Sequence, residues 1–399
     1  ASGTAVIPAV LGTNATNSPI SSTVTITPSY TNNAVTCTGA NSTYTFTVNP
    51  IPTVSALPNQ QVCSGNTVSL NFTSPSNVVG TIYNWTNDNT SVGIGASGVG
   101  NISFTSTNAT NGPITANLVV TPAFSNGGVA CPGVPDSILI TVLPTPVATA
   151  LTPQVLCATN SSTAIALTGN PVGTVFSWTN TNASIGLAAS GNGNIPAFTA
   201  TNNGVTPISG TISAIPSLTT NGQACPGTPV TAQITVNPNP IMNAPASASF
   251  CHGSNAAFNF TSNIANGVTY AWTNTNSSIG LGASGSGNIS FSTQNTGTVP
   301  ISGTVNVIPT YTANGLACPG SAQTFTIQVI PNPTVNAQAN VTLCTGQQST
   351  AISFTSPVAG TTFAWTNANT NIGLGASGSN TVPRQRMQAI AHRSPLRSQ

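Results

Sequence analysis

The eight cysteines and four tryptophans of this chain recur with a single period of 93 or 94 residues. Successive cysteines are separated alternately by 26 residues and by 67 or 68 residues, and each tryptophan follows a cysteine by 21 or 22 residues. The residues are Cys37, Cys63, Cys131, Cys157, Cys225, Cys251, Cys318 and Cys344, with Trp85, Trp178, Trp272 and Trp365. Two residue types on one period indicate a tandem array whose repeat is long enough to bury a core of its own.

Proline pairs mark the boundaries between repeats, at Pro50/Pro52, Pro144/Pro146, Pro238/Pro240 and Pro331/Pro333. A Pro-x-Pro segment favours an extended and fairly stiff connection. The predicted domains are the C-terminal half of a repeat at 1–50, full repeats at 51–144, 145–238 and 239–331, the N-terminal half of a repeat at 332–380, and a non-repeat tail at 381–399.

Apolar residues alternate with Thr, Ser, Asn and Gln throughout the repeats. An aromatic residue precedes Trp85 by two positions, and Ile138, Ile140 and Val142 alternate in the last strand of the same repeat. A period of two residues predicts strands with one buried face. The fold class is therefore all-β, with tandem Ig-like (PKD-like) β-sandwich domains of about 94 residues. The tryptophans are expected to be core anchors rather than platforms for sugars.

Charged side chains make up 2% of the chain, against about 25% in an ordinary soluble domain. Arg384, Arg386, Arg393 and Arg397 lie within the last sixteen positions, and Asp88 and Asp136 are the two acids. Acid–base catalysis, clustered carboxylate metal sites and nucleic-acid binding all need charges that the repeats lack. We therefore expect no enzymatic activity, no cofactor, no metal and no nucleic-acid partner, and the sequence has no apolar run that predicts a membrane span.

Several motifs resemble the PKD-type, Ig-like repeats of very large surface proteins of the Bacteroidetes. They are Cys63-Ser-Gly-Asn-Thr-Val-Ser-Leu, Tyr83-Asn-Trp85-Thr-Asn, the Ile-Gly-Leu-Gly-Ala-Ser-Gly runs at 279–285 and 372–378, and the Ala-Cys-Pro-Gly corners at 130–133, 224–227 and 317–320. The resemblance covers about residues 1–380 and implies type IX secretion with adhesion or gliding. The chain departs from that pattern after the tryptophan, where Thr-Asn-Thr-Asn at 179–182 and 273–276 replaces a carboxylate-rich turn.

Regularly spaced cysteines in even number suggest disulfides and an oxidising, extracellular setting. The preferred pairing lies within repeats, at 63–131, 157–225 and 251–318, and leaves Cys37 and Cys344 to pair outside the covered units. An alternative follows from Ig-like topology, because the first turn and the last hairpin lie at opposite ends of such a unit. It predicts clasps between units, such as 63–225 and 157–318. Cys251-His252 is the one adjacent Cys/His pair, which argues against a metal cluster.

The tail turns abruptly basic after residue 380. Back-translation from Pro383, begun two bases into each codon, permits Thr-Asn-Ala-Ser-Asn-Ser-Pro, which closely matches Thr13-Asn-Ala-Thr-Asn-Ser-Pro19. We hypothesise that residues 381–399 are read in a displaced frame, in which case the parent protein is longer at both ends.

The expected function is structural or adhesive: a stiff extracellular stalk or filament, on or outside a bacterial cell, that associates with itself. Near-zero charge removes the repulsion that keeps proteins apart. The alternatives are a carbohydrate-binding array that recognises surface glycans and an ice- or mineral-binding array, which would need exposed aromatic rings or a flat row of Thr and Asn, respectively.

Scarce charge also predicts a stability that hardly depends on pH or salt, because few groups titrate and few ion pairs are screened. The midpoint of thermal unfolding should stay nearly constant between about pH 4 and pH 8. Differential scanning calorimetry over that range measures it, and a strong shift of the midpoint would contradict this interpretation.

Overall fold

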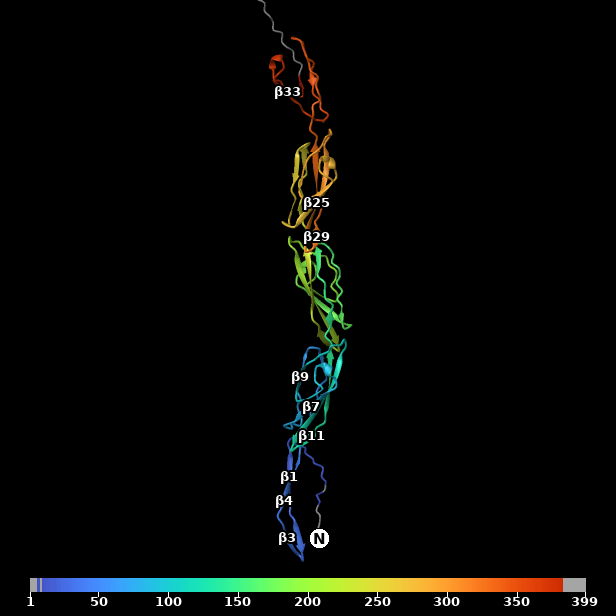
Figure 1. The fold of residues 1–399 in the computed structure, drawn as a ribbon, viewed down its shortest axis with the longest axis vertical. Helices are drawn as coiled ribbons and strands as arrows, with labels where there is room; N and C mark the ends of the chain where they lie inside the picture. Colours follow the sequence, from blue (N-terminus) through green and yellow to red (C-terminus); the bar gives the residue numbers. More distant parts are fainter. Residues whose placement is uncertain (1–5, 8, 383–399) are drawn as a thin grey trace, which may run out of the picture.

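The computed structural model describes residues 6–7 and 9–382, which form a rod of β-sandwich units placed one after another along a single axis (Figure 1). The predicted all-β, tandem Ig-like fold class is confirmed. We keep the predicted ranges as names: unit 1 (51–144), unit 2 (145–238), unit 3 (239–331), the N-terminal half-unit (1–50) and the C-terminal half-unit (332–382, extended by two residues because strand pairing continues to Val382).

Unit 1 contains one large sheet of strand order β5-β12-β10-β7-β8, to which the hairpin strand β11 is added beside β10. The second layer is the antiparallel pair β6–β9. Its elements are β5 (Gln60–Cys63), β6 (Thr67–Leu70), β7 (Ile82–Asn87), the 3₁₀-helix η1 (Thr90–Val92), β8 (Ser97–Val99), β9 (Ile102–Thr105), β10 (Ile114–Asn126), β11 (Val129–Pro132) and β12 (Asp136–Leu143). Strand β5 runs parallel to β12, and the other pairs in this sheet are antiparallel.

Units 2 and 3 repeat the large sheet in the same order. Unit 2 has β13 (Val147–Ala148), β14 (Gln154–Cys157), β15 (Gly169–Asn170), β16 (Val175–Asn180), η2 (Ala183–Ile185), β17 (Ser190–Asn192), β18 (Ile208–Thr220), β19 (Gln223–Pro226) and β20 (Val230–Asn237). Unit 3 has β21 (Met242–Asn243), β22 (Ala248–Cys251), β23 (Asn255–Phe258), β24 (Thr261–Ser262), β25 (Val268–Asn274), η3 (Ser277–Ile279), β26 (Ser284–Ser286), β27 (Ile289–Ser292), β28 (Ile301–Ala313), β29 (Leu316–Pro319) and β30 (Gln323–Ile330).

The second layer is weaker in unit 2 than in units 1 and 3. The segment around Ile165 and Leu167, which is equivalent to β6 and β23, is reduced there to isolated bridges, one of which joins Ile165 to Ile195. The amides of Ile165 and Ile195 each donate to the other residue's carbonyl, and between Ile195 and Phe198 the chain has Pro196 and Ala197 where units 1 and 3 have only Ser103 or Ser290. This extra residue interrupts the register of the pair, so the alternation in this segment does not become a full strand.

Each core lies between the two layers and is made of the alternating residues of the long strands. In unit 1 the inward side chains of β10 and β12, such as Leu118, Ile138 and Ile140, are fully buried against Val68 and Leu70 of β6. Burial of a side chain of this size contributes about 1.5–3 kcal/mol. Units 2 and 3 contain equivalent clusters, so each full unit has a core of its own.

Each tryptophan lies over a glycine on the neighbouring strand. Trp178 is buried, whereas Trp85 and Trp272 are half-buried and pack against the edges of their cores. A Cβ placed on Gly98 would lie 2.2 Å from the ring of Trp85. The equivalent distances are 2.3 Å from Gly191 to Trp178 and 2.2 Å from Gly285 to Trp272. Only glycine fits opposite the ring, which explains why Ser-Gly recurs in this strand.

The two half-units each contain the strands of only part of a sandwich. The N-terminal half-unit has β1 (Ile20–Ile26), β2 (Ser29–Asn32), β3 (Val35–Thr38) and β4 (Ser42–Val48). The C-terminal half-unit has β31 (Ile352–Ser353), β32 (Ala364–Thr366), η4 (Thr370–Ile372), β33 (Ser377–Ser379) and β34 (Thr381–Val382). In the latter, Trp365 is half-buried and its Nε1 donates to the carbonyl of Thr381.

The four arginines and most of the tail, residues 383–399, lie outside the described residues, so the frameshift hypothesis stays a prediction. In the part of the chain that the structure describes, the helices are short 3₁₀ turns, and none is long and apolar enough to cross a membrane.

The contact between glycine and tryptophan generates a stability prediction. Gly98→Ala should destabilise unit 1 by about 1–3 kcal/mol, because the added methyl group forces the Trp85 ring out of its place. Hydrogen–deuterium exchange of β7 and β8, followed by mass spectrometry, measures the loss. Gly95→Ala is the matched control, since its nearest neighbour, the Ser97 carbonyl oxygen, is 3.9 Å from the new carbon. Equal protection in both variants would contradict the prediction.

Candidate functional site: the joints between units

In three of the four Pro-x-Pro segments, the middle residue is hydrogen-bonded to the turn that follows the first cysteine of the preceding unit. Thr145 Oγ1 donates to the carbonyl of Ser64 at 3.1 Å, and Asn239 Nδ2 donates to the carbonyl of Ala158 at 2.8 Å. Asn332 makes the same bond to the carbonyl of His252 at 3.0 Å. The connection is therefore attached along its length and is not a free tether.

The Ala-Cys-Pro-Gly corners fix the other side of each connection. The Cα of Gly133 lies so close to the Pro52 carbonyl that an added Cβ would be 2.0 Å from that oxygen, and Gly227 and Pro146 make the same contact. The corner follows the final hairpin of a unit, whereas the proline opens that same unit. The base of the hairpin therefore packs directly on the Pro-x-Pro connection, and only glycine permits this approach.

The final hairpin of each unit reaches back along the rod to the preceding unit. The strands β10, β18 and β28 are each 13 residues long, and their C-terminal ends extend past the core into the hairpins. At the joint of units 2 and 3, Asn237 Nδ2 donates to the carbonyl of Ala313 at 2.7 Å, and Asn314 Nδ2 donates to Asn237 Oδ1 at 2.9 Å. Asn49 and Asn126 form the same amide pair at the joint before unit 1.

Two disulfides close the joints between the full units. Cys63 is bonded to Cys225 with 5.5 Å between their Cα atoms, and Cys157 is bonded to Cys318 with 5.4 Å. The preferred prediction of pairing within units, at 63–131, 157–225 and 251–318, is wrong, and the alternative of clasps between units describes the bonds that form. The physical reason is the one given by topology: the first turn and the last hairpin of one unit lie at opposite ends, so only neighbouring units bring them together.

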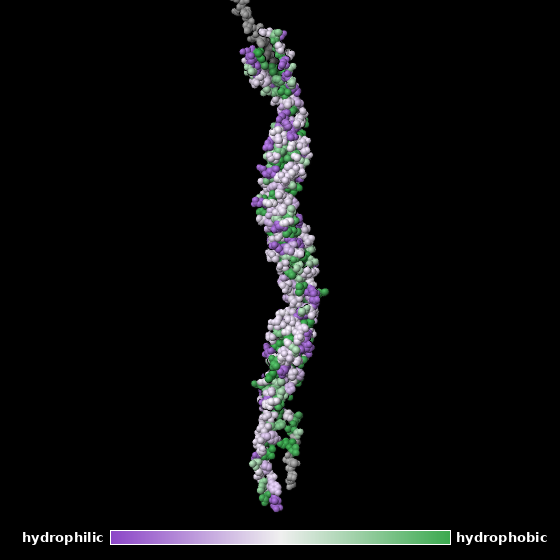
Figure 2. Space-filling view, viewed as in Figure 1, coloured by the Kyte–Doolittle hydropathy of each residue, from purple (hydrophilic) through white to green (hydrophobic). Residues whose placement is uncertain are grey.

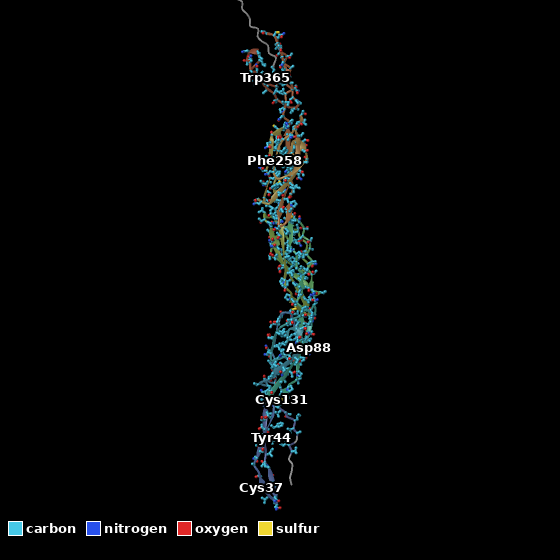
Figure 3. The ribbon with its side chains drawn as sticks, viewed as in Figure 1. Cys37, Tyr44, Asp88, Cys131, Phe258 and Trp365 are labelled. Carbon is cyan, nitrogen blue, oxygen red and sulfur yellow. A yellow bond between two sulfur atoms is a disulfide. The ribbon has the colours of Figure 1, made fainter. Side chains whose placement is uncertain are left out.

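The other four cysteines, Cys37, Cys131, Cys251 and Cys344, are free thiols in the described part of the chain. Cys37 and Cys131 are hairpin residues near the N-terminal end of the rod (Figure 3), whereas Cys251 and Cys344 are first-turn residues of the last two units. In both disulfides, the first-turn cysteine of one unit bonds to the hairpin cysteine of the next unit. We call this pairing the clasp rule. For each of the four free cysteines, the described residues contain no neighbouring unit that supplies such a partner.

The remaining polar candidates make hydrogen bonds that stabilise the fold. His252 Nδ1 accepts from the backbone amide of Asn295 at 2.9 Å, as Ser64 Oγ does from Asn108 in unit 1. Asp88 accepts from the amide of Asn117 at 2.7 Å, and Asp136 accepts from the amide of Leu57 at 3.3 Å. Within residues 6–7 and 9–382, no three His, Cys, Asp or Glu side chains lie close enough to hold a metal ion.

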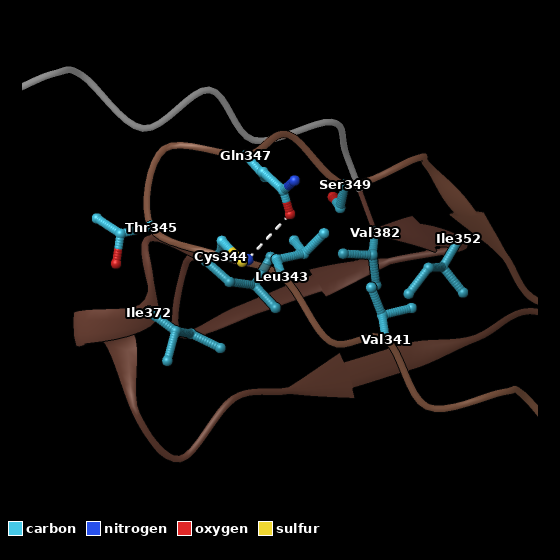
Figure 4. A pocket seen from close by; sticks show the side chains of 10 residues that line it. Val341, Leu343, Cys344, Thr345, Gln347, Ser349, Ile352, Ile372 and Val382 are labelled. Atoms are coloured by element: carbon cyan, nitrogen blue, oxygen red, sulfur yellow. Dashed lines mark hydrogen bonds between the residues drawn. The ribbon is translucent and has the colours of Figure 1, made fainter.

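Two hollows on the described surface could hold a small ligand. One, of about 440 Å³, lies at the joint of units 2 and 3 and is lined mainly by polar residues and prolines that include Asn202, Asn239 and Asn263. The other, of about 420 Å³, lies in the C-terminal half-unit and is lined by apolar side chains (Figure 4). Its apolar residues are Val341, Leu343, Ile352, Ile372, Leu374 and Val382.

No family model matches the chain, and no curated protein matches its sequence. Solved structures of tandem-domain proteins resemble it at low similarity. An I-band fragment of titin aligns with a TM-score of 0.38 and 8% identity, over 70% of this chain and 98% of the fragment. Three N-terminal domains of the Hoc outer capsid protein of bacteriophage RB49 align with a TM-score of 0.32 and 14% identity, over 70% of this chain and 99% of theirs. The insect immune protein hemolin aligns at 0.25 and 12% identity, over 84% of this chain and 92% of its own. At such identities the likeness concerns the fold alone.

The clasps generate a prediction about stiffness. The double variant Cys63→Ser/Cys225→Ser should leave the unit cores folded but loosen the joint, since both cysteines lie outside the three unit cores, in a small cluster with Leu143 at the joint. Small-angle X-ray scattering should show a shorter mean end-to-end length than in the unmodified chain. Cys131→Ser is the matched control, because that thiol is free. Unchanged scattering in the double variant would show that the clasp does not stiffen the joint.

Proposed function

We propose that this chain is a non-catalytic, structural and adhesive rod that works outside a bacterial cell, on the cell surface or in a filament. The observation that carries the proposal is the construction of the joints. Each joint between full units combines a Pro-x-Pro connection, a hydrogen bond from its middle residue, a returning hairpin and a disulfide. A joint fixed at four points resists bending, which serves a stalk and is unnecessary in a protein whose domains act separately.

The disulfides support an extracellular location, because such bonds persist in oxidising compartments. The resemblance of the repeat motifs to PKD-type surface repeats of the Bacteroidetes supports the same setting and suggests type IX secretion. The predicted boundaries at the proline pairs belong to this proposal, since they divide the rod into mechanically equivalent segments.

The neutral surface supports association with other surfaces or with further copies of the chain. Polar and apolar residues are mixed along the rod (Figure 2), and the described residues carry two acids, Asp88 and Asp136, and no Lys or Arg. Little electrostatic repulsion opposes close approach, and hydroxyl and amide groups can hydrogen-bond at the contacts. Such contacts would be insensitive to salt.

Electron microscopy and surface labelling in the native organism test the proposal together. We expect straight rods or filaments that antibodies reach on intact cells, with the Cys63–Cys225 and Cys157–Cys318 bonds recovered by mass spectrometry after chymotryptic digestion without reduction. A protein confined to the cytoplasm with all its cysteines reduced would overturn the proposal.

Carbohydrate binding is the second candidate, favoured by the polar hollow at the joint of units 2 and 3. Asn202, Asn203, Asn239 and Asn263 line this hollow. An amide oxygen can accept from a sugar hydroxyl. A glycan array probed with the intact chain and with Asn203→Leu, an exposed residue of the hollow, tests the site: binding that the variant abolishes would favour a lectin-like role.

A further inference from the structure

We propose that the Cys63–Cys225 clasp forms a tension strap inside the rod. Tension that enters unit 1 at Pro52 leaves it at Cys63, crosses the disulfide to Cys225 and runs on to Cys251, so it passes all three full units beside their cores. The inference deepens the proposed structural role and rests on it for its biological use. Its physical basis is the span, the direction and the covalent connection of a few extended segments.

The segment from the Pro-x-Pro connection to the first-turn cysteine crosses a whole unit. In unit 1, Pro52 lies against Gly133 at the base of the final hairpin, and Cys63 lies opposite Leu143 at the other end. Residues 52–63 and 133–143 therefore span the same length, although they differ by only one residue, and most of the second segment is strand β12. A strand rises about 3.3 Å per residue against a limit of about 3.6 Å. Residues 52–63 consequently have little slack.

Units 2 and 3 repeat this geometry at both of their ends. The proline–glycine contacts are Pro146 with Gly227 and Pro240 with Gly320, and the strand pairs at the other ends are Cys157 with Asn237 and Cys251 with Ile330. Two nearly extended segments thus cross each full unit, one from its first half and one from its second half.

The two crossing segments of a unit lie side by side and run the same way. They form the parallel pairs β5–β12, β14–β20 and β22–β30, whereas the other described pairs of the large sheets are antiparallel. Because parallel strands point in one direction along the rod, a pull along its axis acts on both strands in the same sense.

The clasp joins these segments end to end. Cys63 ends the first crossing segment of unit 1, and its partner Cys225 lies just before the second crossing segment of unit 2, which contains β20. That segment continues through the Pro-x-Pro connection at 238–240 into the first crossing segment of unit 3, which ends at Cys251. The covalent path from Pro52 to Cys251 therefore bypasses the chain between Cys63 and Cys225, a sequence separation of 162.

Without the clasp, the same pull would act across the core of unit 1. Load would enter at β5 and leave at the end of β12, so it would shear apart two strands that share only a short register, from Gln60 opposite Ile140 to Cys63 opposite Leu143. With the clasp, the load leaves β5 at Cys63. The β5–β12 pair and the core that follows it are then outside the load path.

The disulfide that would carry this load is shielded from solvent. Cys63 is 6% exposed and Cys225 is 0% exposed, and both pack with Leu143 in a small cluster at the joint. Thiol–disulfide exchange requires an attacking thiolate to reach one of the two sulfurs. The folded joint therefore protects from small thiols the bond on which the strap depends.

Force spectroscopy of the full chain tests the strap. One handle is attached to Cys251, an exposed thiol, and the other to an azide introduced by Ile51→p-azidophenylalanine, at a position that is 62% exposed. Serine replaces the other free thiols of the described residues, so that only the intended cysteine reacts; they are Cys37, Cys131 and Cys344. The handles then load the chain from the start of unit 1 to the first turn of unit 3.

Two variants on this background form a matched pair. Cys157→Ser/Cys318→Ser keeps the strap closed, and the further changes Cys63→Ser/Cys225→Ser open it. With the strap closed, we expect no unfolding step and a lengthening of at most about a fifth, from the straightening of strands. With the strap open, we expect stepwise unfolding and a final extension greater by about 530–580 Å, because the bypassed stretch, with its sequence separation of 162, then joins the pulled chain.

Unfolding steps in the variant with the closed strap would overturn the proposal, since load would then reach the cores. Equal final extensions in the two variants would overturn it as well, because the clasp would not lie on the load path. Either result would leave a rod on the cell surface standing as the proposed function. A closed strap that holds under load, in a protein that its native cells confine to the cytoplasm, would do the reverse.

Discussion

The architecture depends on one strand that serves two units at once. In β10, β18 and β28, the first part of the strand contributes to the core of its own unit, and the last part enters the hairpin that reaches the preceding unit. The strand is continuous, so the orientation of the core fixes the orientation of the hairpin. Each joint thus gains its rigidity from the sheet that folds beside it.

Amide and hydroxyl groups perform tasks that charged side chains often perform in other proteins. Asn180 Nδ2 donates to three carbonyls of the turn after Trp178, and Asn182 caps η2. Asp88 accepts a hydrogen bond from the backbone amide of Asn117. At the equivalent place in unit 2, the hydroxyl of Thr181 accepts from the backbone amide of Thr211. A neutral residue fills the same position in the neighbouring repeat, so the charge of Asp88 is incidental to its structural role.

The sequence was sufficient to predict what depends on local pattern. The Cys and Trp period and the alternation around Trp85 predicted the tandem β-sandwiches, and Asn221-Gly222 forms a hairpin turn with positive φ at both residues. In unit 1 the turn instead falls on Gly127 and Gly128, one position later than Asn126-Gly127, the Asn-Gly dipeptide of that hairpin. Turn position depends on how the strands register across the whole hairpin, which a dipeptide does not specify.

Disulfide connectivity was not predictable from spacing, because it depends on which ends of a unit face one another. The Gly133 corner and the middle residue Thr145 were visible as repeats, but their roles appear only when the hairpin and the connection are seen in contact. The same reasoning explains the half-units. Local registers survive in β1–β4 because a hairpin depends on its own turn, whereas β32 is short because a central strand needs a neighbour on both edges. The parts of the repeat that form by themselves are those with local partners, and the incomplete parts are those whose partners come from the other half.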